Sequence, residues 1–171
     1  LAALNKMQPS PSQKGPPQEK INQLITLYNQ KQLTAAVRLA TPLTEQYPEA
    51  FILWNILGAA NKGLGKTLDA AEAFKRVIAL NPNYADGFNN LGTVLKDQGK
   101  LQDAVEAFKK SISLKPDNAD AYYNMGNTLK SQGKLNDAIE AYLKELAINP
   151  HHAETYNNMG ITFKQQGKLK D

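Results

Sequence analysis

The chain has 171 residues, of which 42% are apolar and 21% are charged, with 20 Lys and Arg against 16 Asp and Glu and no cysteine. This length suffices for one domain of ordinary size, and the lack of cysteine excludes disulfides, thiolate zinc sites, iron–sulfur clusters and cysteine nucleophiles. The longest apolar run (50–54) is far shorter than the roughly 20 residues of a membrane-spanning helix, and the small positive excess is spread evenly, so we expect a soluble, cytoplasmic protein that neither inserts into a membrane nor binds nucleic acid.

Residues 1–16 lack any periodic apolar pattern. They are rich in proline and serine, at Pro9, Ser10, Pro11, Ser12 and Pro16. Such a composition cannot bury enough apolar surface to order the chain, so we predict a flexible linker.

From residue 17 onward the sequence repeats with a period of 34 residues. Four sets of residues keep this spacing: Pro48, Pro82, Pro116 and Pro150; Gly58, Gly92, Gly126 and Gly160; Gly65, Gly99, Gly133 and Gly167; Ala36, Ala70, Ala104 and Ala138. A fixed period of this length is typical of arrays of stacked structural units. The period divides the chain into units 17–50, 51–84, 85–118 and 119–152, followed by a partial unit 153–171.

Each unit is predicted to form two antiparallel helices. Apolar residues recur at helical spacing within 88–95 and again within 101–112, and the Gly99-Lys100 pair between them suits a tight turn. The proline at the end of the unit ends the second helix, because the residue before a proline is pushed out of the helical region. The fold class is therefore predicted to be all-α.

The glycine inside each first helix needs a packing explanation, because glycine there costs about 1 kcal/mol relative to alanine. We expect a close backbone approach at Gly92, with Ala104 as the facing small residue, and likewise in the other units. Three aromatic residues of the second helices are expected to fill the space between one helix pair and the next: Phe74, Phe108 and Tyr142.

The two ends depart from the repeat pattern. Unit 17–50 has Leu24 in place of the glycine and is predicted to be a degenerate capping repeat, with a kink or an early helix end at Pro42. The partial unit 153–171 offers one helix, which is expected to act as a C-terminal cap. A fragment of a longer protein is favoured over a complete one, also because the chain opens with Leu1.

The units resemble the tetratricopeptide repeat family. Unit 51–84 carries the residues of the family pattern at Trp54, Leu57, Gly58, Ala70, Phe74 and Pro82, and departs from it at Asn61. The resemblance implies a right-handed superhelical solenoid of antiparallel helix pairs, in which the first helices line a concave groove that binds other proteins.

Three columns of polar residues would line that groove. They are Asp86, Asp120 and Glu154; Asn90, Asn124 and Asn158; and Lys62, Lys96, Lys130 and Lys164. The acids and lysines have an alternative structural explanation, because an acid in the first turn and a cation in the last turn each complement the helix dipole.

The asparagine column is the stronger candidate for ligand binding, because asparagine is a poor residue for a helix interior. Its amide can pair with both the N–H and the C=O of a peptide backbone. The runs 89–92 and 157–160 resemble the repeat arms of O-linked N-acetylglucosamine transferases, which implies that Asn90, Asn124 and Asn158 hold an extended peptide. The alternative is that these amides bond within the repeat scaffold.

No residue pattern indicates catalysis, a metal site or a cofactor. The histidines are His151 and His152, adjacent in sequence and expected to be solvated loop residues, and no nucleophile or phosphate-binding motif occurs. The chain is therefore predicted not to be an enzyme.

Three functions remain open at this point. The first is a protein-interaction scaffold that binds an extended, acidic peptide in the groove. The second is the substrate-docking arm of a larger glycosyltransferase or sulfotransferase. The third is self-association through the exposed ends of the array.

Overall fold

The computed structural model describes residues 15–167, which form nine α-helices and no strand. The helices are α1 (Gln18–Asn29), α2 (Leu33–Gln46), α3 (Phe51–Gly63), α4 (Thr67–Leu80), α5 (Ala85–Asp97), α6 (Leu101–Leu114), α7 (Ala119–Ser131), α8 (Leu135–Ile148) and α9 (Ala153–Gln165). The predicted all-α fold is confirmed. None of the described helices combines the length and the apolar character needed to cross a membrane. The predicted linker lies outside the described residues up to residue 14, as do residues 168–171.

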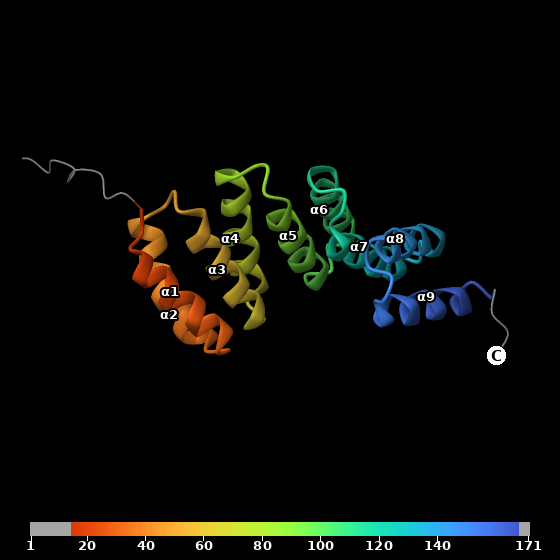
Figure 1. Cartoon of the computed structure of the whole chain (residues 1–171), viewed down its shortest axis with the longest axis horizontal. Coiled ribbons are helices and arrows are strands. Elements are labelled where there is room, and N and C mark those ends of the chain that lie inside the picture. Colours follow the sequence, from red (N-terminus) through yellow and green to blue (C-terminus); the bar gives the residue numbers. More distant parts are fainter. Residues whose placement is uncertain (1–14, 168–171) are drawn as a thin grey trace, which may run out of the picture.

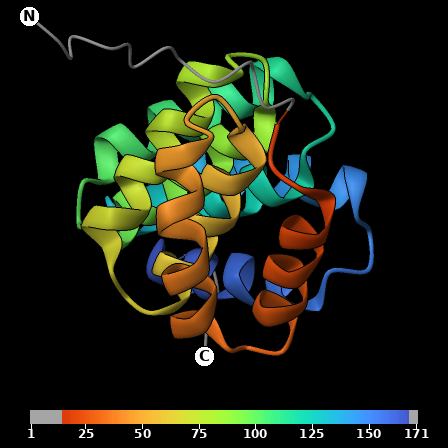
Figure 2. The ribbon, with the colours of Figure 1, turned by 90° about the vertical axis from the view of Figure 1, so that its left-hand side faces the viewer.

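The helices form an elongated array of pairs (Figure 1). Helices α1 to α8 make four pairs, and α9 follows as the first helix of a fifth. Viewed along the long axis, successive helices wind around it, so the array is a solenoid (Figure 2).

The two helices of a pair have different neighbours. Each first helix contacts the next first helix, from α1 through α3, α5 and α7 to α9. Within residues 15–167, the backbone of no second helix comes as close to the backbone of the next second helix. The first helices are therefore drawn together on the inner side of the curved array, and the second helices are spread apart on its outer side.

Glycine ends the first helix of each regular pair. Gly65, Gly99 and Gly133 have φ values of 72° to 75°, in the left-handed region that favours glycine. In the first unit Lys31 takes this place with a φ of 60°, which is one respect in which that unit is irregular.

Three of the glycines inside the first helices lie against an aromatic ring of the second helix: Gly58, Gly92 and Gly126. A Cβ atom on Gly92 would be 2.6 Å from Phe108, and one on Gly126 would be 2.6 Å from Tyr142. The facing role of Ala104 and its equivalents stays a prediction, because the three atoms nearest to an added Cβ all belong to the ring of the second helix. The rings also reach the next unit as predicted, since Phe108 shares a core cluster with Met125.

Pro42 does not end its helix. Helix α2 continues through it to Gln46, so the predicted early end is wrong. Leu43 and Thr44 follow the proline and are buried, and Leu43 shares a core cluster with Leu53 of the next unit. Burial of this last turn outweighs the local cost of the proline, which is about 3 kcal/mol in a helix interior.

Gly160 is the exception among the four helix-interior glycines. An added Cβ there would meet nothing within 4 Å, because α9 has no second helix among the described residues. Gly92 and Gly160 therefore form a matched pair with opposite surroundings.

We expect Gly92→Ala to lower the free energy of unfolding by about 1 to 2 kcal/mol, because the new methyl group collides with the fully buried Phe108. Gly160→Ala should leave stability unchanged or raise it by up to about 1 kcal/mol through helix propensity. Urea unfolding followed by circular dichroism measures both. Equal effects of the two substitutions would contradict the role assigned to the glycine–ring contact.

Candidate interaction surface on the inner face

The predicted polar columns lie on the first helices, on the inner side of the array. Asp86, Asp120 and Glu154 stand in the first turns of α5, α7 and α9, and Lys62, Lys96, Lys130 and Lys164 stand in the last turns of α3, α5, α7 and α9. Ten residues separate the two columns along a helix, which corresponds to about 15 Å. The inner face thus has an acidic edge and a basic edge, with the asparagines between them.

Two of the three predicted asparagines bond to the preceding first helix. Asn124 Nδ2 donates to Asn89 Oδ1 at 3.1 Å, and Asn158 Nδ2 donates to the hydroxyl of Tyr123 at 3.2 Å. Asn90 is half-buried, and its side chain makes no hydrogen bond within residues 15–167. In this column, Asn124 and Asn158 therefore bond within the scaffold, whereas the Asn90 amide does not.

Two of the four lysines of the inner face, Lys62 and Lys130, are partly removed from water. Burial lowers the pKa of Lys62, with Asp97 opposing the shift and Lys96 adding to it. Burial also lowers the pKa of Lys130, whose Nζ donates to Asn158 Oδ1 at 2.9 Å. A charge that burial disfavours gains more from an anionic partner than a fully hydrated one does.

The acids take part in contacts between units. Tyr123 donates to Glu154 at 3.2 Å across the α7–α9 contact, and Asn118 Nδ2 lies 3.5 Å from Asp86 Oδ1. These contacts add to the favourable position of an acid in the first turn of a helix.

Tyr123 is the inner-face residue that the sequence analysis missed. Its hydroxyl accepts from Asn158 and donates to Glu154, so it joins two of the columns. One signal was available, since Tyr123 stands 34 residues after Asn89 and 34 before Asn157 and interrupts their column.

His152 is not a solvated loop residue, which corrects the prediction. Its Nδ1 lies 3.0 Å from Glu145 Oε1 and 2.8 Å from the hydroxyl of Thr155. Glu145 is only 1% exposed, and the His152 ring centre is 4.9 Å from that of Tyr123. His151, by contrast, is exposed as predicted.

The His152–Glu145 contact repeats an arrangement found one unit earlier. Asn118 Nδ2 donates to the buried Ser111 Oγ at 3.1 Å, and both residues stand 34 positions before His152 and Glu145. A polar pair across the end of the second helix is thus a feature of two successive units. No group of three or more His, Asp or Glu residues within 15–167 is suited to a metal ion.

Comparison with known families places repeats along most of the chain. Family models described as "TPR repeat" match residues 92–133 and 126–167. Models described as "Tetratricopeptide repeat" match residues 73–106 and 22–85. No curated protein matches the chain.

Several solved structures are similar to this one. A crystal structure of MamA is 26% identical, with 84% of each chain covered and a TM-score of 0.79. MamA from Desulfovibrio magneticus RS-1 (41-end) is 20% identical over 88% of this chain and 85% of that chain, with a TM-score of 0.81. YrrB, described as a TPR protein with an unusual peptide-binding site, is 20% identical over 88% of this chain and 78% of that one, with a TM-score of 0.73. At 20% identity the last two show a shared fold.

We expect Tyr123→Phe to lower the free energy of unfolding by about 1 kcal/mol, because it leaves Asn158 and Glu154 without the hydroxyl that joins them. Tyr122→Phe is the matched control, since no hydrogen bond involves the Tyr122 hydroxyl in the described part of the chain. Thermal or urea unfolding of the two variants provides the comparison. A Tyr122→Phe effect as large as that of Tyr123→Phe would refute the joining role.

Lys62→Met should raise the free energy of unfolding by about 0.5 kcal/mol or less, because burial disfavours the charged form of Lys62. The folded pKa is below its ordinary value, so the unfolded chain binds more protons as the pH approaches 10.5, and the wild type gains stability relative to the variant there. Urea unfolding at several pH values measures this. A loss of stability would favour the helix-dipole explanation of the lysine column.

Proposed function

We propose that this chain, which belongs to the tetratricopeptide repeat family of protein-interaction scaffolds, binds an extended segment of a partner protein along its inner face. In this proposal Asn90, Asn124 and Asn158 pair with the backbone of the segment. The lysine column (Lys62, Lys96, Lys130 and Lys164) favours acidic side chains. The protein acts by recognition, and catalysis is not part of the proposal.

The observation that carries the proposal is the unpaired amide of Asn90. The half-buried Asn90 amide remains accessible to water, and a peptide backbone offers both a donor and an acceptor to replace that water. One unit further on, Asn124 uses its Nδ2 but makes no bond through Oδ1 in the described residues, so an acceptor remains for a backbone N–H. An extended chain passing from α5 to α7 would meet both groups.

The charge distribution of the inner face favours one orientation of the bound segment, with its acidic side chains toward the lysines. The lysines stand at one edge of the inner face and the acids at the other, about 15 Å away. Acidic side chains of a bound segment would gain from the partly buried ammonium groups of Lys62 and Lys130 and would be repelled by the opposite edge. The similar structure of YrrB, a TPR protein described as having an unusual peptide-binding site, is consistent with this assignment.

The test uses a capped nonapeptide of alternating Glu and Thr, which favours an extended conformation, and its Lys–Thr counterpart. Asn90→Ala/Asn124→Ala should weaken binding of the acidic peptide about tenfold, corresponding to two lost hydrogen bonds. Isothermal titration calorimetry gives the affinity, and circular dichroism checks that the helix content is unchanged.

Asn83→Ala is the matched control, because Asn83 is an exposed asparagine of the α4–α5 loop. It should leave the affinity unchanged. Binding of the acidic peptide should also weaken with added salt and exceed that of the Lys–Thr peptide. An unchanged affinity in the double variant would show that the asparagines do not hold the peptide.

A further inference from the structure

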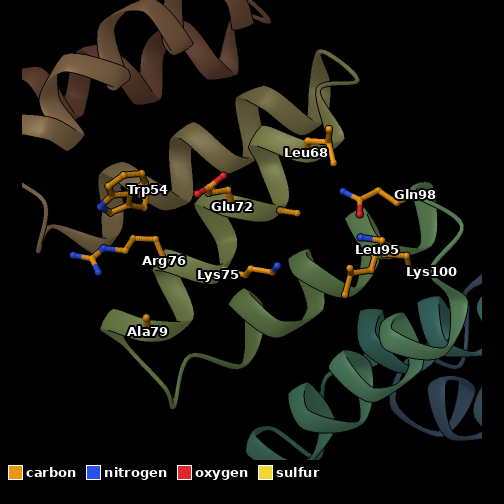
Figure 3. Close-up of a pocket in the computed structure, with 10 residues that line it drawn as sticks. Trp54, Leu68, Glu72, Lys75, Arg76, Ala79, Leu95, Gln98 and Lys100 are labelled. Atoms are coloured by element: carbon orange, nitrogen blue, oxygen red, sulfur yellow. The ribbon is translucent and has the colours of Figure 1, made fainter.

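The spread of the second helices leaves a pocket of about 830 Å³ on the outer side of the array, away from the asparagine column. It runs along α4 and is bordered by the end of α5 and the start of α6. Trp54 and Arg76 lie at one side of it and Leu95, Gln98 and Lys100 at the other, with α4 between them (Figure 3).

Leu68 lines this pocket and is apolar where the other units have a polar residue. Its side chain is 75% exposed, more than any other large apolar residue of the described chain. The equivalent places in the other units are polar: Thr34, Gln102 and Asn136. An exposed leucine where the repeat otherwise places a polar residue, beside a pocket, indicates a contact surface.

The apolar part of the pocket is rigid. Ala71 and Leu95 are buried, and the Trp54 indole N–H donates to the Pro48 carbonyl at 2.9 Å, which fixes the ring. Gln98 Nε2 donates to the Thr67 carbonyl at 2.8 Å and ties the end of α5 to the start of α4. A partner would therefore meet a preformed surface.

The charged groups around the pocket are mostly basic. Arg76 is paired with Glu49 at 3.3 Å, whereas Lys75 and Lys100 form no ion pair within the described residues. Glu72 is the one acid among the lining residues. The surplus of positive charge favours a partner with carboxylates on either side of its apolar contacts.

The length of the pocket fits a short helix. Its lining residues on α4 extend from Leu68 to Ala79, eleven residues or about 16 Å, which is three helical turns. We propose that this outer pocket binds an acidic amphipathic helix of a partner protein. Apolar side chains of that helix contact Leu68 and the accessible part of the Trp54 ring, and its carboxylates pair with Lys75 and Lys100.

The probe is a capped 15-residue helical peptide. Its leucines are spaced alternately three and four residues apart, glutamates flank the leucines, and the other positions are alanine. We expect the whole chain to bind it with a micromolar Kd by fluorescence anisotropy. Leu68→Gln should weaken binding at least tenfold; the substitution is compatible with folding because Gln102 occupies the equivalent place one unit later. Lys75→Glu/Lys100→Glu should abolish binding and allow the same peptide with lysine for glutamate to bind instead.

Leu143→Gln is the matched control, because Leu143 is an exposed leucine on α8, outside this pocket. It should leave the affinity unchanged, as should Asn90→Ala/Asn124→Ala, which separates this site from the inner face. The proposal is overturned if Leu68→Gln retains wild-type affinity, if Leu143→Gln weakens binding equally, or if the lysine peptide binds the wild type as well as the glutamate peptide. It is also overturned if sedimentation shows an oligomer of the free chain that Leu68→Gln dissolves, since a second copy would then occupy the pocket.

Discussion

The contact between a glycine of the first helix and an aromatic ring of the second sets the geometry of each unit. With no Cβ at Gly58, Gly92 or Gly126, the ring of Phe74, Phe108 or Tyr142 lies directly against the helix backbone. Each ring is fully buried, so the distance between the paired helices has little freedom. The same contact recurs every 34 residues, and near-identical units stacked at near-identical angles form a solenoid.

The inner face joins neighbouring units largely through polar groups. Asn124 reaches back to Asn89, and Asn158 links Lys130 and Tyr123 across the α7–α9 contact. The side chains that would meet a bound peptide are thus partly the ones that hold successive first helices in register. In the proposed binding mode, recognition and curvature depend on the same residues.

The period of the sequence was enough to predict the helix pairs and the glycine turns, and the resemblance to the tetratricopeptide repeat implied that the polar columns face inward. It could not show how those columns bond, because the distance between α7 and α9 is a property of stacking and not of either helix alone. Glu145 and His152 are seven residues apart across a helix end, so no search for same-face spacing brings them together. The early helix end expected at Pro42 does not occur, because the burial of Leu43 and Thr44 depends on residues of the next unit, which a local preference does not include.

Because the second helices are spread apart, the array bends more easily on its outer side than on its inner side. On the inner side, each first helix contacts the next first helix. On the outer side, the backbones of α4 and α6 are connected only through α5, which lies between them. Tilting one unit toward the next narrows the inner face and widens the outer pocket by the same rotation. Partners bound at the two proposed sites would therefore act on a single angle, and each would change the strain that the other encounters even though no residue touches both.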